Sequence, residues 1–171
     1  VLFRSSASLD GIGARGEYIR HGMRSTEVIE NIKQLRNECS HVRLEITPTI
    51  NVFNAGHVCD MHQELVELGI LHVDDIQLNP LLYPAFQSIK VLPSNPKSAV
   101  ARRITHHMSW LHQQGTNQRV IDSFHELFAF MDSEDHSHML PSLRQHTHKL
   151  DLLRNEDVHA VFPELREAFL D

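Results

Sequence analysis

The chain has 171 residues, of which 41% are hydrophobic and 22% charged, and its formal net charge at pH 7 is −6. This length and composition suit one globular domain that buries a substantial core. The negative charge disfavours a general nucleic-acid binder, so no nucleic-acid partner is expected. No apolar run is long enough to cross a membrane, and the two cysteines, Cys39 and Cys59, are too few for a disulfide framework. We therefore expect a cytoplasmic protein with no membrane association.

The first half of the chain alternates predicted strands with predicted helices. In chain order these are a strand over 1–7, a helix beginning near 26, a strand over 42–47 that extends toward 51, a helix over 60–68 and a strand over 75–78. A polar, glycine-rich loop is expected over 11–24. The succession of strand, helix, strand, helix and strand is typical of a parallel α/β sheet with right-handed crossovers.

The second half is predicted to be helical. After an irregular, proline-containing stretch, the expected elements are helices over 95–115, 117–131 and 141–153, a solvated loop over 132–138 and a short helix near 163. Asn117 is expected to cap one of these helices. Asp60 is expected to cap the helix of the first half, with Gln63 as its capping-box partner. The predicted organisation is an α/β part over 1–93 and a helical region over 94–171.

The 14 histidines are an unusually high count, and several fall close together. The close groups are His106–His107 with His112, His136 with His138, and His146 with His148. None forms the HExxH pattern of a zinc enzyme, and spacings of two or five do not place two imidazoles squarely on one helical face. We expect solvated histidines or histidines at the rim of the core, and we assign no metal ligand.

The glycine-rich segment over 11–16 has the spacing of the GxGxxG dinucleotide fingerprint and follows a predicted strand. The residues after it, Glu17 to Gly22, are not typical of a small-residue helix start. No acidic residue ends the next strand, where a ribose would be bound. The segment is therefore a weak dinucleotide signal.

Polar side chains close each of the three predicted strands. Ser8 and Asp10 follow the first strand, Asn51 and Asn54 the second, and Asn79 the third. The carboxyl ends of parallel strands meet at one edge of a sheet, where ligands bind. Hydroxyl, carboxylate and amide groups suit a ribose or the amino and carboxylate groups of an amino acid. The alternative is that these residues only form the turns that follow strands.

Several segments together resemble a known family. The quoted runs are Ser-Leu-Asp-Gly over 8–11, Glu-Tyr-Ile-Arg-His-Gly over 17–22, Thr-Glu-Val-Ile-Glu-Asn-Ile over 26–32, Leu-Glu-Ile-Thr-Pro-Thr-Ile-Asn-Val-Phe-Asn over 44–54, and the segments 79–93 and 149–165. Their succession resembles the radical S-adenosylmethionine (radical SAM) enzymes of the twitch-domain type. The resemblance covers nearly the whole chain and keeps the order of the segments.

The resemblance implies a partial (β/α)6 TIM-like barrel in which S-adenosylmethionine lies across the carboxyl ends of the strands. The three strands here would be the fourth, fifth and sixth, so the chain would form the C-terminal half of that barrel. The implied cofactor-binding residues are Ser8, Asp10, Asn54 and Asn79. A small-molecule or peptide substrate would bind over the same edge.

The chain departs from this family in one respect. The CxxxCxxC motif that holds the [4Fe–4S] cluster is absent, and two distant cysteines cannot supply three thiolates. We therefore expect a fragment of a radical SAM enzyme that is inactive alone, whereas the full-length parent would generate a 5′-deoxyadenosyl radical. Its unpaired strand edge is expected to favour self-association. Two alternatives are a non-catalytic α/β module that binds a nucleotide-like ligand or a partner protein, and half of a different TIM-like enzyme.

Overall fold

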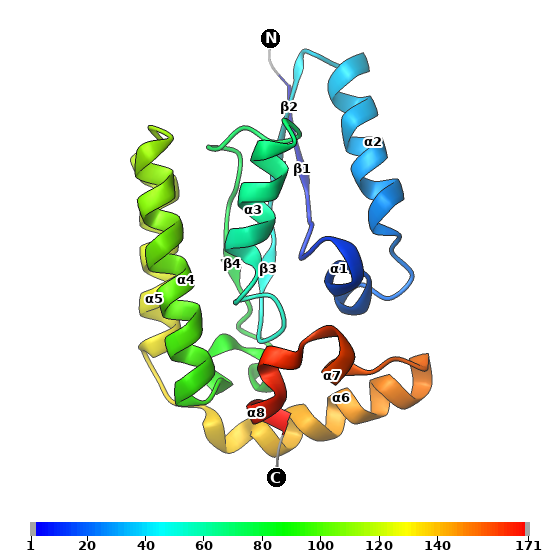
Figure 1. Ribbon diagram of the computed structural model, residues 1–171, viewed down its shortest axis with the longest axis vertical. Helices are drawn as coiled ribbons and strands as arrows, with labels where there is room; N and C mark the ends of the chain where they lie inside the picture. The colour runs from blue at the N-terminus through cyan, green and yellow to red at the C-terminus, as the bar shows by residue number, and fades with distance from the viewer. Residues whose placement is uncertain (1–2, 170–171) are drawn as a thin grey trace.

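The computed structural model describes residues 3–169 and shows a mixed α/β fold that is mostly helical (Figure 1). In chain order its elements are β1 (Phe3–Ala7), α1 (Gly13–Ile19), α2 (Ser25–Glu38), β2 (Val42–Ile46), β3 (Thr49–Ile50), α3 (Val58–Glu67), β4 (Asn79–Pro80), the 3-10 turns η1 (Ala85–Gln87) and η2 (Ile89–Val91), α4 (Ser94–Gln113), α5 (Gln118–Asp132), η3 (Ser137–Met139), α6 (Leu140–Arg154), α7 (Val158–Val161), η4 (Pro163–Leu165) and α8 (Arg166–Phe169). The first two residues of the predicted opening strand lie outside the described residues.

The strands form two small parallel sheets of two strands each. β1 pairs with β2 in the register Phe3↔Val42 to Ala7↔Ile46, and β3 pairs with β4. A parallel bridge between Ile46 and Ile76 links the two sheets. The predicted parallel α/β arrangement is thus confirmed in this coarse form, while two short sheets do not establish a partial barrel.

Pro48 explains why the sheet is split. Backbone hydrogen bonds run from Ile46 N to Asp75 O, from Gln77 N to Ile46 O, from Asn79 N to Pro48 O and from Leu81 N to Ile50 O. This ladder is regular except at Pro48, which has no N–H to donate. The strand predicted over 42–47 and extending toward 51 is therefore two strands. The range predicted as a strand over 75–78 holds the isolated bridge at Ile76, and the strand β4 follows that range.

The loop predicted over 11–24 is wrong, because helix α1 occupies its centre. Gly16 lies inside α1 against the backbone of Gly11, and a Cβ at Gly16 would come within 2.3 Å of Gly11 O. Only glycine permits this approach of helix to strand end. Gly11 and Gly16 thus serve backbone packing, whereas Gly13 has a positive φ of 60° and no close neighbour. Tyr18 is buried on the inner side of α1.

Two predicted helix starts have different outcomes. The prediction at Asn117 is confirmed, because its side-chain oxygen accepts a hydrogen bond from Arg119 N at 3.1 Å. The prediction at Asp60 is wrong, because α3 begins at Val58 and has no side-chain cap. Gln63 instead donates to Glu67 along the exposed face of the helix.

The buried residues of both halves of the chain form one hydrophobic cluster, from Leu9 to Leu165. In the view of Figure 1, α2 lies to the right of the strands and the paired helices α4 and α5 lie to the left. Helices α6, α7 and α8 lie across the end where the strands finish. The C-terminal helices therefore cover the carboxyl edge of the strands. Within residues 3–169, no helix is long and apolar enough to cross a membrane.

Two histidines lie in the core, which corrects the expectation of solvated or rim positions. His62 on α3 and His107 on α4 are 0% and 2% exposed, with Nδ1 of His62 3.0 Å from Nε2 of His107. Nε2 of His62 lies 3.1 Å from Val73 O, so it donates there, and Nδ1 accepts the proton of His107 Nε2. This arrangement satisfies the pair with both rings neutral, and the rings pack against Trp110 and Phe124.

The histidine pair predicts acid-sensitive stability. Burial lowers the pKa of His62 to about 4 and that of His107 to about 3. An unfolded imidazole binds a proton near its ordinary pKa of about 6.5, so between these values the unfolded state binds more protons. The free energy of unfolding is therefore expected to fall as the pH is lowered from about 6.5 toward 4, by up to about 1.4 kcal/mol per pH unit for each histidine.

Urea unfolding at several pH values tests this expectation. The double variant His62→Leu/His107→Phe should lose this part of the pH dependence, whereas His112→Leu, at an exposed position of the same helix α4, should retain it. A double variant with the same slope as the parent chain between pH 6.5 and 4 would show that the pair is not responsible.

Candidate functional site

The carboxylate of Asp10 joins the ends of two strands. Asp10 follows β1 and is 7% exposed. Its Oδ1 accepts a hydrogen bond from Thr49 N at 2.7 Å, at the start of β3, and its Oδ2 accepts one from Arg20 Nε at 2.9 Å. Because both oxygens are in use, Asp10 fixes the strand edge rather than offering a free acceptor to a ligand.

Arg20, which follows α1, also connects Asp10 to Ser8. Its Nη2 donates to Ser8 Oγ at 2.7 Å, and Ser8 is exposed. The side chain of Arg20 remains 41% exposed, so part of the guanidinium faces solvent beside the strand end. Ser8 and Arg20 are therefore the parts of this network that a ligand can reach.

Asn54 binds the backbone on three sides and is 2% exposed. Its Nδ2 donates to Asp10 O at 3.0 Å and to Thr49 O at 2.9 Å. Its Oδ1 accepts from Asn51 N at 2.8 Å. The amide of Asn54 thus holds the turn after β3 against the turn after β1 and has no group left for a ligand.

The structure brings three of the four predicted cofactor-binding residues together and leaves the fourth apart. Ser8, Asp10 and Asn54 belong to the network around Arg20 and Thr49. Asn79 pairs with Thr49 across the sheet, but its side chain is exposed and forms no hydrogen bond with the described residues. Asn79 is therefore a neighbour of the network through its backbone only.

A cavity of about 360 Å³ opens at this edge of the strands. Its polar lining comes from α1, from the strand ends, from η1 and from helix α6. The polar lining residues are Asp10, Tyr18, Thr49, Asn51, Gln87, His146 and Arg154. Side chains from both halves of the chain therefore meet around one space.

Arg154, His146 and Gln87 were not predicted as site residues. His146, Leu150 and Arg154 are spaced by four and so share one face of α6, a signal that is visible in the sequence. That spacing shows only that the three side chains lie together. It does not show that their face covers the strands, which is a tertiary contact.

The phenol of Tyr18 links the edge to α6. Its hydroxyl donates to Asp151 Oδ1 at 2.7 Å, and Val158 N donates to the other oxygen of Asp151 at 3.0 Å. Burial, together with the hydrogen bond to Asp151, raises the pKa of Tyr18, so its hydroxyl stays protonated and acts as a donor.

The C-terminal segment packs onto the same edge through an aromatic cluster. Phe162 is 1% exposed, and its ring centroid lies 5.4 Å from that of Tyr18 and 5.6 Å from that of Phe53. Arg15 lies over the Phe162 ring, 5.9 Å from its centroid. Phe162 therefore packs the C-terminal segment against Tyr18 and Phe53, two residues that line the cavity described above.

Glu164 adds an ionic contact between this segment and the helices near the edge. Its carboxylate accepts from His57 Nε2 and, at 3.4 Å, from Arg15. Burial opposes the ionisation of Glu164, but the hydrogen bond from His57 and the charge of Arg15 hold its pKa below its usual value. Glu164 is thus an anion at neutral pH that fixes the C-terminal segment.

The described residues do not suit an iron–sulfur cluster. Among them, no group of three or more His, Cys, Asp or Glu is placed to hold a metal ion. Cys39 is half-buried at the end of α2, and Cys59 is buried within α3. Burial raises the pKa of Cys59 to about 12, which disfavours the thiolate that binds iron. This chain therefore lacks the ligands of a [4Fe–4S] cluster.

Comparison of the chain with family models, with curated proteins and with solved structures found no match. The geometry of the strand edge is therefore what indicates a function for this chain.

The position of Asp10 predicts a stability effect. Asp10→Ala leaves Thr49 N–H without its acceptor and removes the anion that Arg20 binds, so the free energy of unfolding is expected to fall by about 2 kcal/mol. Asp10→Asn keeps an oxygen for Thr49 N–H and should cost less. Urea unfolding measures both variants, and equal losses would show that the hydrogen bond to Thr49 is not the stabilising contact.

Proposed function

We propose that this chain forms the S-adenosylmethionine-binding half of a twitch-type radical SAM protein. Its three parallel segments would be the fourth, fifth and sixth strands of a partial (β/α)6 barrel, followed by the helical C-terminal region. The observation that carries the proposal is the cavity of about 360 Å³ at the shared carboxyl edge, lined by polar groups from successive strand ends. This is where parallel α/β folds bind their ligands.

The polar groups at this edge match the groups that S-adenosylmethionine presents. Its carboxylate suits a guanidinium, and Arg154 lines the cavity while Arg20 lies exposed beside it. Its ribose hydroxyls suit the amide of Gln87, which lines the cavity. Asn79, exposed on β4, is the candidate for the adenine side.

Asp10 and Asn54 take a different role from the one implied by the family resemblance. Their polar atoms bind the backbone and Arg20, so they act as positioning residues that keep the two strand ends together. Ser8 remains a candidate contact through its exposed hydroxyl, which Arg20 orients.

We do not assign the [4Fe–4S] cluster or the radical chemistry to this chain. The cysteines do not fit a [4Fe–4S] cluster. The residues at the strand edge would bind and orient S-adenosylmethionine and form part of the wall for a small-molecule or peptide substrate.

Within the described residues, the outer edge of β1 has no strand partner and Phe3 is 62% exposed. In the full-length protein that we propose, a further strand would pair with this edge of β1. Where that strand is missing, a second copy of the chain would pair with the edge instead.

The second candidate is a non-catalytic module for a nucleotide-like ligand or a partner protein. The observation that favours it is the packing of the C-terminal segment at the strand edge, where Phe162 contacts the cavity-lining Tyr18 and Phe53 and Glu164 binds His57. Both candidates predict a ligand at the same edge. They differ in whether that ligand is S-adenosylmethionine.

Titration of the chain with S-adenosylmethionine tests the proposal. Calorimetry should detect binding, and amide signals should shift at 8–10, 18–20, 49–51 and 146–154. Arg154→Met removes the guanidinium in the cavity wall and should weaken binding about tenfold. Arg36→Met, on the exposed face of α2, is the matched control and should bind as the parent chain does. Absence of binding at millimolar ligand, or equal binding by both variants, would contradict the cofactor assignment.

Anaerobic reconstitution with iron and sulfide is expected to leave the chain without visible iron–sulfur absorbance, because its two cysteines are distant and Cys59 is buried. Any absorbance that persists in a Cys39→Ser/Cys59→Ser variant would come from adventitious iron. A stable cluster that depends on the two cysteines would overturn our view that the ligands lie elsewhere.

A further inference from the structure

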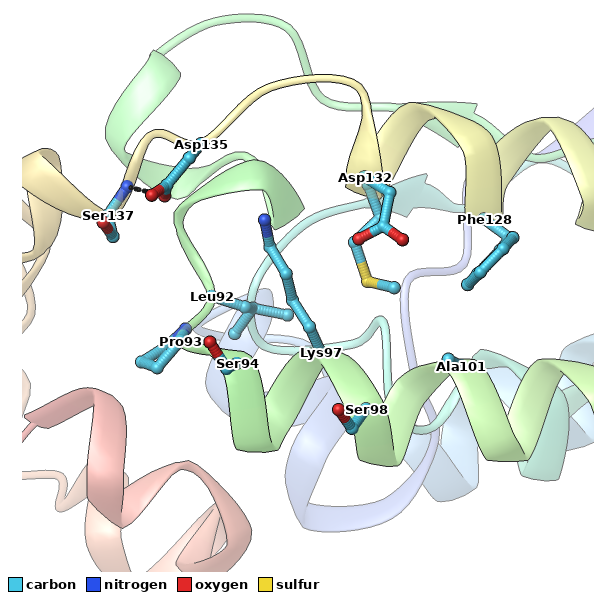
Figure 2. Close-up of a pocket in the computed structure, with 11 residues that line it drawn as sticks. Leu92, Pro93, Ser94, Lys97, Ser98, Ala101, Phe128, Asp132, Asp135 and Ser137 are labelled. Carbon is cyan, nitrogen blue, oxygen red and sulfur yellow. Dashed lines mark hydrogen bonds between the residues drawn. The ribbon is translucent and has the colours of Figure 1, made fainter.

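A separate groove of about 580 Å³ lies between the beginning of α4 and the end of α5 (Figure 2). It shares no lining residue with the cavity at the strand edge. One wall comes from the first two turns of α4, and the other comes from α5 and the loop after it. The groove is therefore a second candidate binding site, independent of the proposed function.

Three charged side chains line the groove, and within residues 3–169 they form no ion pair with one another at contact distance. Lys97 on α4 is half-buried, and neither its ammonium nor the carboxylate of Asp132 forms a hydrogen bond or ion pair with any residue among 3–169. Asp135 uses one oxygen to accept from Ser137 N at 2.9 Å. In Figure 2 the Lys97 ammonium stands between Asp135 and Asp132. The Lys97 ammonium and the Asp132 carboxylate thus have no direct partner among residues 3–169. Hydrogen bonding by Ser137 and the charge of Lys97 lower the pKa of Asp135, so it is an anion with one oxygen left to accept from a ligand.

The loop that carries Asp135 is held in place. Glu134 accepts from Lys90 Nζ at 2.8 Å and lies 3.1 Å from Nε2 of His136. Lys90 also lies over the Phe130 ring, 4.5 Å from its centroid. These contacts bind the loop after α5 to η2, so Asp132 and Asp135 flank the groove in a defined arrangement.

The groove also has an apolar surface. Met131 is 1% exposed and Leu92 is 2% exposed, and both contribute to its lining. Phe128 is 38% exposed, whereas Phe124 and Leu127 of the same helix are buried. Figure 2 shows the Phe128 ring at the opposite end of the groove from Asp135. An aliphatic chain laid along this surface would cover the exposed ring.

We propose that this groove binds a free basic α-amino acid. A ligand that carries only positive charge would be repelled by Lys97. A ligand that carries only negative charge would be repelled by Asp132 and Asp135. A basic amino acid satisfies all three: its carboxylate binds Lys97, and its two cationic groups bind the two carboxylates. Its methylene chain packs against Phe128 and Met131.

Titration of the isotope-labelled chain with L-lysine, followed by amide signals, tests the proposal. Binding with a dissociation constant on the order of 1 mM is expected, because the charged groups are partly exposed. The shifted signals should lie at 92–101 and 128–137. Cadaverine lacks the carboxylate and L-norleucine lacks the side-chain ammonium, so each should bind about tenfold more weakly.

Variants assign the effect to the groove. Lys97→Met should weaken L-lysine binding about tenfold and abolish the preference over cadaverine. Lys33→Met, at an exposed position of α2, is the matched control and should leave binding unchanged. No shifts in the groove at about 10 mM L-lysine, or equal binding of cadaverine and L-lysine, would overturn the proposal.

Discussion

The buried carboxylate of Asp10 is the contact on which the carboxyl edge of the strands depends. Asp10 follows β1 and accepts a hydrogen bond from the N–H of Thr49, the first residue of β3. It also binds the guanidinium of Arg20, so one anion joins two strands and the end of α1. Asn54 reinforces the same junction from the other side through backbone oxygens of Asp10 and Thr49. An edge built this way is rigid because its polar groups are already satisfied. Ligand contacts must then come from the residues around it.

Those surrounding residues come from parts of the chain that are distant in sequence. Arg154 and His146 reach the cavity from α6, and Gln87 reaches it from η1. The aromatic cluster of Tyr18, Phe53 and Phe162 then holds the C-terminal segment against α1. The cavity is therefore a product of both halves of the chain, although only the first half carries the strands. This is why the helical region belongs to the site as well as to the core.

The sequence predicts elements well where one local signal decides them. Val100, Ile104 and Leu111 recur at helical spacing and are buried on α4, and Asn117 caps α5 as its position predicts. Prediction fails where tertiary contact reverses a local signal. Gly16 has the local character of a loop residue, yet it lies in a helix because that helix packs on the Gly11 backbone.

The candidate site is predictable in position but not in composition. Polar residues after strands indicate the edge, and Ser8, Asp10 and Asn54 do meet there. Their hydrogen bonds cannot be inferred from spacing, so the sequence does not distinguish a residue that holds the edge from one that faces the cavity. His107 shows the same limit, because nothing in its local sequence indicates that His62 satisfies it in the core.

The hydrogen bond between Tyr18 and Asp151 spans 133 positions of the chain. During synthesis, α1 and the strand ends therefore leave the ribosome long before the helix that completes the cavity. Contacts between residues so far apart in sequence form late in folding. The chain must lose the conformational entropy of a long loop before such a contact can stabilise the fold. The nascent chain thus presents Tyr18 and Phe53 uncovered until the last helices are made. The carboxyl edge of the strands therefore depends on complete translation and on protection from aggregation.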